Sequence, residues 1–254
     1  MEQNILITND DGVSSKGLRA LTEEASRFGR VTVVAPEHGM SGMSHAITMA
    51  NPLYLRKVRQ SDGVTVYACQ GTPVDCVKIA IDHVMKNDPP TLVLSGINHG
   101  SNSNISVIYS GTMGAATEGC SYGIPSIGFS LITHDVEADL MPTRHYVRKI
   151  LEAVLEHNDN PSLCLNVNVP VLPLDSIKGI RVCRQTKGHW REAFEKKCDP
   201  RGREYYWLTG SFVNLEPEAG DNDESALAEG YVSVVPVKVD LTDYRQIEVS
   251  KGWF

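Results

Sequence analysis

The sequence predicts an α/β protein built on a mostly parallel sheet with helices on both faces, and three observations lead to this prediction. Apolar runs at residues 5–7, 31–35 and 91–94 have the composition of strands that are buried on both sides. Segments with helical spacing of apolar residues lie between these runs. A polar stretch that contains glycine follows each run, as expected where the carboxyl end of a parallel strand leaves the sheet.

Length, composition and charge limit the classes of protein to consider. The chain has 254 residues, enough for one large domain or for a domain with a smaller lobe. Hydrophobic residues make up 41% and charged residues 22%, which is typical of a globular protein. The formal net charge of -7 argues against binding a nucleic-acid polymer, because such binding relies on basic contacts to phosphates. No apolar stretch reaches the roughly 18 residues of a membrane span.

The cysteines and the first residues indicate the compartment. None of the six cysteines forms a C-x-x-C pair, so zinc-ribbon chemistry is not expected and the thiols should be reduced. Residues 1–4 lack the basic flank of a secretory signal and lead directly into the first apolar run. We therefore expect a cytoplasmic protein.

Strands and helices alternate along the first half of the chain. Residues 15–28 place Leu18 and Leu21 on one helical face, and Pro36 ends the strand at 31–35. Residues 65–69 alternate as a strand, after which Thr72 caps a helix with Pro73 in its first turn. The other elements expected here are a strand at 91–94, a polar loop at 95–102, a helix at 113–122, a strand at 124–131 and a helix at 145–157.

Beyond about residue 160 the pattern becomes richer in β-structure. Strands are expected at 163–169, 177–183, 205–208 and 231–239. The basic run at 184–203 and the acidic run at 216–229 are most simply solvated loops or arms. We predict a core at residues 1–160, and at 161–254 the completion of that core plus an extended β-hairpin or arm that packs against another subunit.

The three polar stretches at the strand ends offer oxygen ligands for a metal. Asp10 and Asp11 follow the first strand, Ser41 lies in the loop after the second, and Asn98 follows the strand at 91–94. Adjacent carboxylates repel each other, so a divalent cation between them would favour the charged form of both. A donor set of oxygen atoms suits magnesium, manganese or calcium. The alternative to a metal site is ordinary turn structure, because Asp-Asp-Gly can form a simple turn and a serine such as Ser41 often occurs in turns.

A helix start at residues 110–112 is the candidate phosphate site. The free N–H groups of a first helical turn and the helix dipole attract anions, although Ser110 and Thr112 could instead act only as caps. His45 and His99 are candidate general acids, but loop histidines are more often solvated. Motifs of ATPases, dinucleotide-dependent dehydrogenases and lipase-like hydrolases are absent from the sequence.

Five segments in the first 130 residues or so together form a specific pattern: Ile-Leu-Ile-Thr-Asn-Asp-Asp-Gly at 5–12, Val-Val-Ala-Pro at 33–36 with Ser-Gly at 41–42, Gly-Thr-Pro-Val-Asp-Cys-Val at 71–77, Ser-Gly-Ile-Asn-His-Gly at 95–100 and Ile-Tyr-Ser-Gly-Thr at 108–112. In these segments the chain resembles the survival protein E (SurE) family of metal-dependent 5'-nucleotidases. The resemblance implies a cytoplasmic enzyme with a Rossmann-like, three-layer catalytic core and a C-terminal arm exchanged within a dimer or tetramer.

The resemblance also assigns site residues. It implies one divalent cation per subunit, Mg²⁺ or Mn²⁺, on Asp10, Asp11, Ser41 and Asn98, with the two aspartates also catalytic. Met40 and His45 stand where many relatives carry Gln and Asn, which leaves the base or sugar preference open. The residues expected to bind phosphate or substrate are Asn9, Gly42, Ser44, His45, Asn102, Ser110, Gly111 and Thr112.

The leading hypothesis is a phosphomonoesterase that converts nucleoside 5'-monophosphates into nucleoside and phosphate. Nucleoside 3'-monophosphates and short polyphosphate are further substrates that the resemblance implies. Either aspartate could orient the attacking water or attack phosphorus itself. A nucleotide-binding or sensing module without turnover is the alternative, and a weaker idea is an oligomeric scaffold in which the charged C-terminal runs matter most.

Overall fold

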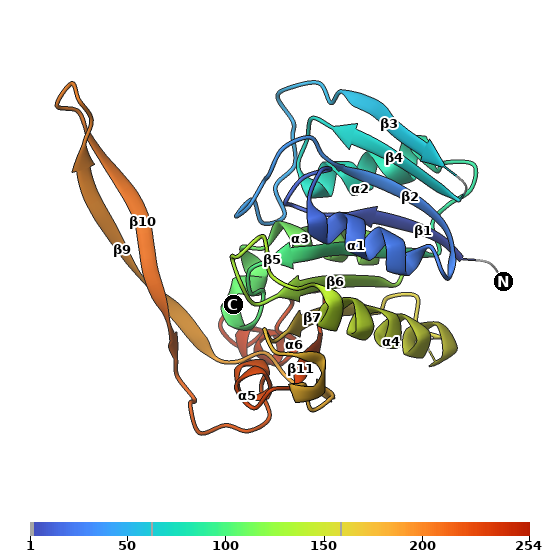
Figure 1. Ribbon diagram of the computed structural model, residues 1–254. Coiled ribbons are helices and arrows are strands. Elements are labelled where there is room, and N and C mark those ends of the chain that lie inside the picture. The colour runs from blue at the N-terminus through green and yellow to red at the C-terminus, as the bar shows by residue number, and fades with distance from the viewer. Residues whose placement is uncertain (1–2, 62, 158) are drawn as a thin grey trace.

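A nine-stranded mixed sheet forms the centre of the computed structural model, which describes residues 3–61, 63–157 and 159–254 (Figure 1). Six neighbouring strands, from β4 to β7 in the order given below, run parallel; β3 is antiparallel to β4 and β11 is antiparallel to β7, whereas β8 runs parallel to β11. The predicted α/β class is therefore confirmed. In spatial order the strands are β3 (Leu55–Ser61), β4 (Val64–Cys69), β2 (Gly29–Pro36), β1 (Gln3–Thr8), β5 (Leu92–His99), β6 (Ser126–Leu131), β7 (Cys164–Val169), β11 (Val232–Pro236) and β8 (Ile180–Val182).

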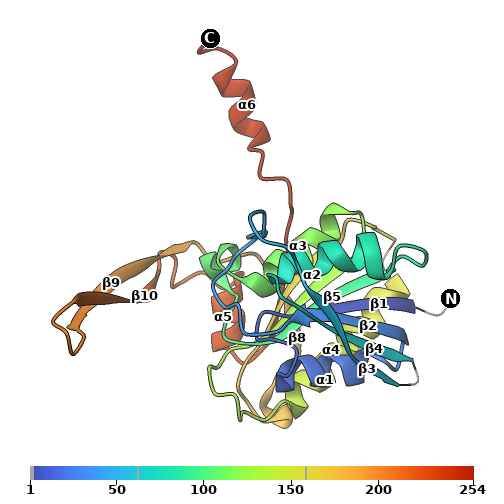
Figure 2. The ribbon, with the colours of Figure 1, turned by 90° about the horizontal axis from the view of Figure 1, so that it is seen from above.

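Helices cover both faces of the sheet and make three layers. On one face lie α1 (Lys16–Ala25) and α4 (Met141–His157); on the other lie α2 (Pro73–Ile79), extended by the π-helical turn η1 (Ala80–Val84), and α3 (Gly111–Ser121) (Figures 1 and 2). Strand β1 shows why its sequence is continuously apolar. Ile5 and Ile7 pack in the core with α1 and α4, whereas Leu6 packs toward α2, and all three side chains are fully buried.

Local sequence signals fix several element boundaries. Ser15 caps α1 by accepting a hydrogen bond from Leu18 N, and the helix ends at Ala25, earlier than the predicted residue 28. Thr72 and Asp75 form a capping box at the start of α2, as the Thr-Pro sequence predicts for its N-terminus.

The polar stretch at 95–102 is not entirely a loop, which corrects the prediction. Strand β5 continues to His99, with a register irregularity between Ser95 and Asn98 in its pairing with β6. Gly96 takes a φ of 124°, which side chains rarely adopt. Glycine therefore lets polar residues stay in the strand while the ladder is interrupted. Asn98 consequently lies on the sheet itself.

The C-terminal part contributes both to the sheet and to two projections. β7, β11 and β8 belong to the central sheet, whereas β9 (Gly188–Cys198) and β10 (Glu204–Asn214) pair as an antiparallel hairpin that extends away from it (Figure 1). Helix α6 (Tyr244–Ser250) projects in another direction (Figure 2). The short elements are η2 (Asn104–Ile108), η3 (Leu174–Ser176) and α5 (Asp223–Ala228).

The acidic run at 216–229 is not simply a solvated loop. It contains α5, and the side chain of Asp223 is fully buried there. The basic run, by contrast, is largely the exposed strand β9, in keeping with an arm. No helix among the residues that the structure describes is long and apolar enough to cross a membrane.

A buried carboxylate joins α1 to α4. The Glu24 side chain is 1% exposed and accepts hydrogen bonds from Arg144 Nε at 2.9 Å and from Arg148 Nη2 at 2.7 Å. Burial acts to raise the pKa of Glu24, but the hydrogen bonds from Arg148 and Arg144 outweigh it and hold this pKa below its ordinary value.

We expect Glu24→Gln to lower the free energy of unfolding by about 2 kcal/mol at pH 7, since three arginines, Arg27, Arg144 and Arg148, lose their shared charged partner while solvent still screens them. Because the pKa is lower in the folded chain, Glu24 stabilises the protein above about pH 4.5 and this contribution is lost on acidification. Urea unfolding at pH 7 and pH 4 measures both effects. Glu23→Gln, at a side chain 49% exposed, is the control and should cost less than about 0.5 kcal/mol. Equal effects of the two variants would contradict this account.

Candidate active site at the carboxyl edge of the sheet

The predicted site residues lie near β1, where the order in which the chain adds strands to the sheet reverses. β1 pairs with β2 on one side and with β5 on the other, so the chain builds one half of the sheet and then returns to build the second half. The carboxyl ends of strands at such a switch point border a crevice that binds ligands in open α/β sheets. Asp10 and Asp11 follow β1, and Asn98 and His99 end β5, so these residues lie on the two sides of the switch point.

Asp10 is the most buried carboxylate of the predicted metal site. Its side chain is 4% exposed, and the hydroxyl of Thr112 donates to its Oδ1 at 2.5 Å. Burial raises the pKa of Asp10 to about 6; the hydrogen bond from Thr112 opposes this rise, and the negative charge of Asp11 adds to it. Among the residues that the structure describes, no basic side chain forms an ion pair with this carboxylate to favour its charged form.

Asp11 contacts the end of β5. Its Oδ2 accepts a hydrogen bond from the backbone N–H of His99 at 3.3 Å and lies 3.4 Å from Nδ1 of the same residue. Asn98, next to His99, is 8% exposed and donates from Nδ2 to Gly100 O at 2.8 Å. This bond orients the amide and commits its donor side, so the carbonyl oxygen of Asn98 is the atom left for a ligand.

The loop after β2 approaches Asp10 through its backbone. Met40 N–H donates to Asp10 O at 2.7 Å. Ser41, the next residue, is exposed, and Gly42 has a φ of 75° in open surroundings. The structure thus brings the predicted ligand Ser41 to the same edge as Asp10, on an exposed loop.

The start of α3 packs directly against Asp10. Ser110 is the N-cap and accepts from Met113 N at 3.0 Å. A Cβ on Gly111 would lie 2.9 Å from the Asp10 Cβ, so only glycine allows this approach. The first-turn N–H groups of an α-helix have no intrahelical acceptor, so this helix end, the predicted phosphate site, presents N–H donors beside the carboxylate.

Ser44 and His45 reach α3 from the other side. The Ser44 hydroxyl donates to Ile108 O at 2.6 Å, and its carbonyl oxygen would be 2.3 Å from a Cβ on Gly114. His45 Nε2 lies 2.7 Å from Glu118 Oε2, and its Nδ1 lies 3.1 Å from the Thr117 hydroxyl. Both ring nitrogens are therefore engaged along the flank of α3, and a substrate role for His45 stays a prediction.

Two predicted substrate residues are fixed inside the protein framework. Asn9 donates from Nδ2 to Gly12 O at 3.1 Å and to Ser15 Oγ at 2.8 Å, which shapes the turn that carries the two aspartates. Asn102 donates from Nδ2 to Ser130 Oγ at 2.8 Å, and its backbone N–H donates to Asn168 Oδ1 at 2.8 Å. Their amides hold the loops in place.

The chemistry of this edge fits a hard cation. Asn9 Oδ1, Ser95 Oγ and His99 Nε2 are buried here without a hydrogen-bond partner among the described residues. Such groups concentrate where a ligand or ion completes a site. No cluster of three or more His, Cys, Asp or Glu side chains suited to a metal occurs in the described ranges. A cation here would therefore rely on two carboxylates plus neutral oxygens, the mixture that Mg²⁺ and Mn²⁺ accept.

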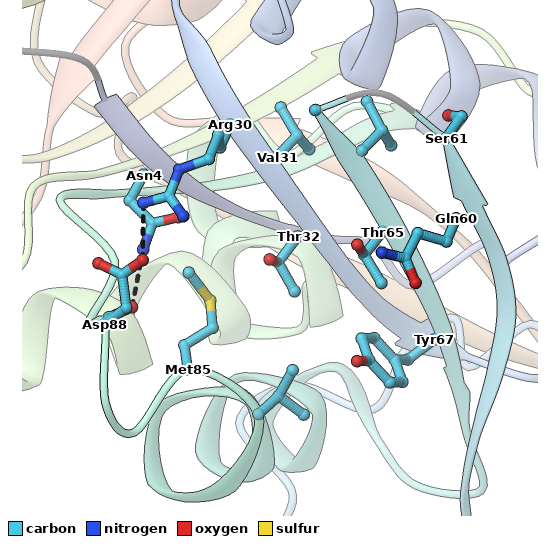
Figure 3. A pocket seen from close by; sticks show the side chains of 13 residues that line it. Asn4, Arg30, Val31, Thr32, Gln60, Ser61, Thr65, Tyr67, Met85 and Asp88 are labelled. Atoms are coloured by element: carbon cyan, nitrogen blue, oxygen red, sulfur yellow. Dashed lines mark hydrogen bonds and ion pairs between the residues drawn. The ribbon is translucent and has the colours of Figure 1, made fainter.

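Two hollows lie in different parts of the protein. One, of about 570 Å³, is lined by Ser44, His45 and Ser110 and, across from them, by residues 235–239 and Leu241. The other, of about 370 Å³, lies at the amino ends of β1, β2 and β4, where Asp88 holds Arg30 and Asn4 (Figure 3). None of the predicted site residues lines this second hollow.

The sequence indicates His99 only as a candidate general acid. The structure places its side chain, 6% exposed, against Asp11. The position of His99 directly after Asn98 is the signal that the sequence offers, but the contact with Asp11, 88 residues earlier, cannot be inferred from a local pattern.

Comparisons with known proteins agree on one family. The family profile described as "Survival protein SurE" matches residues 5–192. The chain is 51% identical to a protein named 5'-nucleotidase SurE from Christiangramia forsetii and 49% identical to one of the same name from Phocaeicola vulgatus, each match covering 98% of this chain and 96% of the relative. The crystal structure of the SurE protein from Aquifex aeolicus superimposes with a TM-score of 0.84 at 36% identity, covering 98% of this chain and 99% of that one.

The raised pKa of Asp10 predicts that Asp10→Asn stabilises the metal-free protein at pH 7.5. A carboxyl whose pKa rises from 3.8 to about 6 on folding costs stability as the pH rises through 6, up to about 3 kcal/mol, and costs nothing below about pH 4. Urea unfolding with chelator at pH 4 and pH 7.5 measures the difference. The exposed Asp82→Asn should change the free energy of unfolding by less than about 0.5 kcal/mol at either pH. A metal-free Asp10→Asn protein less stable than the wild type at pH 7.5 would contradict the prediction.

Proposed function

The chain belongs to the Survival protein SurE family, and we propose that it is a 5'-nucleotidase that hydrolyses nucleoside 5'-monophosphates to nucleoside and phosphate. The observation that carries this proposal is the contact between Asp10 and Thr112. It joins the acidic end of β1 to the anion-binding start of α3, so a cation and a phosphate would lie side by side. The turnover-free binding module has no comparable support, because the relatives that match almost the whole chain are named as enzymes.

Asp10, Asp11, Ser41 and Asn98 would hold one divalent cation, Mg²⁺ or Mn²⁺. When bound, this cation supplies positive charge that polarises the phosphate ester and offsets the repulsion between the carboxylates. The neutral oxygens of Ser41 and Asn98 complete the set without adding charge. Asn9 contributes by keeping the Asp10–Asp11 turn closed through its bond to Gly12 O.

The start of α3 would bind the phosphate. The N–H groups of Gly111 and Thr112 carry the positive end of the helix dipole, and Ser110 and Gly42 are the further residues proposed to contact the phosphate. In the reaction, water attacks phosphorus, the bond from phosphorus to the ribose oxygen breaks, and the nucleoside leaves with a proton on that oxygen. Fixed N–H donors stabilise the charge that develops on the phosphoryl oxygens. Asp10 or Asp11 would orient this water. In the alternative, one of these carboxylates attacks phosphorus, the ribose oxygen leaves, and water then hydrolyses the resulting aspartyl phosphate to free carboxylate and phosphate.

The hollow of about 570 Å³ would receive the nucleoside. It begins at Ser110, so a phosphate at the α3 start would lead into it, and Val235, Val237 and Leu241 give it an apolar wall for a base. Ser44 and His45 line its rim and are the proposed contacts to the sugar or base. Nucleoside 3'-monophosphates and short polyphosphate remain predicted additional substrates, and a cytoplasmic location remains a prediction from the sequence.

The C-terminal projections would join copies of the chain into a homo-oligomer. On the hairpin, Phe194 and Leu208 are paired across the strands and are 64% and 63% exposed, and Trp207 is 59% exposed. On the segment around α6, Leu241 and Phe254 are also exposed. Apolar side chains on arms that extend away from the core match a second protein surface.

We expect the wild-type protein with Mn²⁺ to release phosphate from AMP or GMP, and Asp10→Asn or Asp11→Asn to lower kcat by at least about a thousandfold without unfolding the protein. Phosphate release measures turnover, and circular dichroism measures folding. The melting temperature should rise with Mn²⁺ only in the wild type. Full activity of either variant in the presence of chelator would refute the metal site.

We expect the double variant Phe194→Ser with Leu208→Ser to shift the protein toward smaller species, because these two facing side chains are large, apolar and more than 60% exposed on the hairpin. Sedimentation velocity measures the species at fixed concentration. Glu192→Ser, on the same strand, is the control and should leave the distribution unchanged. A double variant that sediments like the wild type would rule out this face as the contact.

A further inference from the structure

The loop at residues 100–110 connects the two halves of the proposed site. It follows Asn98 of β5 and leads to Ser110, the cap of α3. Within the loop, Asn104 begins the turn η2 with a φ of 51°, a left-handed conformation that residues other than glycine adopt infrequently. The path of this loop therefore depends on contacts that hold Asn104 in place.

A buried carboxylate from the C-terminal part of the chain supplies the main contact. Asp223, the first residue of α5, is 0% exposed, and its Oδ2 accepts a hydrogen bond from Asn104 N–H at 2.8 Å. Its Oδ1 accepts from the backbone N–H and the hydroxyl of Thr186 at 2.9 and 2.6 Å. Thr186 lies two residues before β9, so one carboxylate joins the site loop to the base of the hairpin.

Two further side chains from the same region hold the loop. Glu224 Oε1 accepts from Ser103 Oγ at 2.6 Å and from Asn104 Nδ2 at 2.8 Å. Trp190, near the start of β9, donates from Nε1 to Ser106 Oγ at 3.1 Å. The loop is thus attached to α5 and to the hairpin base at three successive points.

The attachment of the loop depends on the hydrogen bonds that Asp223 accepts. In the described part of the chain, Asp223 is hydrogen-bonded only to N–H and O–H donors, with no basic side chain in an ion pair with it. Loss of this buried acceptor would leave several donors unpaired, and the free-energy cost of unpaired buried donors exceeds the net stability that the hydrogen bonds contribute. The loop conformation is therefore coupled to the presence of this one carboxylate.

We propose that Asp223 and Glu224 are positioning residues for the nucleotidase reaction, which hold the 100–110 loop so that Ser110 and Asn98 face the same substrate. This inference rests on the proposed function. No described hydrogen bond or ion pair joins either carboxylate to Asp10 or Asp11, so both act through the loop and not on the reacting atoms. A displacement of the α3 start relative to the metal side would misalign the phosphate, and misplacement by about 1 Å can cost on the order of a hundredfold in rate.

The test compares four variants of the full-length protein. Asp223→Asn turns one acceptor into a donor that faces Asn104 N–H or Thr186, and Glu224→Ala removes the acceptor for Ser103 and Asn104. Glu224→Gln keeps an oxygen at that position and is the conservative rescue. Asp221→Asn is the control, because its carboxylate is 69% exposed and pairs with Arg184 without contacting the loop.

We expect Asp223→Asn and Glu224→Ala to lower kcat/KM for AMP by roughly tenfold to a hundredfold. Both should keep the wild-type dependence of the melting temperature on Mn²⁺ concentration, because ligand stabilisation depends on metal affinity and the metal end of the site is unchanged. Glu224→Gln and Asp221→Asn should remain within about twofold of the wild type.

Each contrary result has a distinct meaning. Wild-type kcat and KM in a folded Asp223→Asn or Glu224→Ala protein would overturn the positioning role. Should Asp223→Asn fail to fold, the comparison of Glu224→Ala with Glu224→Gln decides, and equal activity of these two would overturn the proposal. Absence of phosphate release by the wild type itself would remove the proposed function and this inference with it.

Discussion

The burial of the Asp10 carboxylate beside Asp11 is the interaction on which the rest of this site depends. A carboxylate that is 4% exposed, with a threonine hydroxyl as its side-chain hydrogen-bond partner, is unfavourable as an anion. This cost raises the pKa of Asp10 to about 6, and burial is its largest cause. The fold therefore creates a place where either a proton or a cation must compensate the charge. A divalent ion would do so and would at the same time attract a phosphate.

The surrounding structure brings the start of α3, the proposed phosphate-binding element, to that carboxylate. Gly111 and Gly114 remove the side chains that would keep α3 away from Asp10 and from the backbone of Ser44. Strand β1, buried on both faces, fixes the position of the two aspartates, and its neighbours β2 and β5 deliver the other two oxygen-bearing segments. Distant parts of the chain then complete the loops, as the contacts of Asp223 with Asn104 and Thr186 illustrate.

Much of the core could be predicted from the sequence because its signals are local. Each of these signals predicts the structure of the residues next to it in the sequence. Examples are the apolar run at 5–7, the Thr72–Pro73 cap and the small residues at the start of α3. The edge strand β3 could not be predicted, since its residues are nearly all exposed and carry no buried pattern. The same holds for most of β9, which is a strand only through its pairing with β10.

Within the site, the sequence indicated which segments carry the chemistry but not how their side chains are used. Asn98 was expected in a loop, whereas an interrupted ladder keeps it on β5. His45 was expected at the substrate, and the structure shows its ring nitrogens against Glu118 and Thr117 of α3. Asp223 lay in an acidic run that resembled a solvated surface, because its partners are more than 30 residues away and a local pattern cannot reveal them.

A crystal structure of the protein with Mn²⁺ would test the central claim most directly. Anomalous scattering locates manganese independently of the surrounding model of the protein. We expect one strong peak within coordination distance of both Asp10 and Asp11 in each subunit, with Ser41 and Asn98 oriented toward it. Active protein whose crystals show no manganese between these two carboxylates would contradict the account.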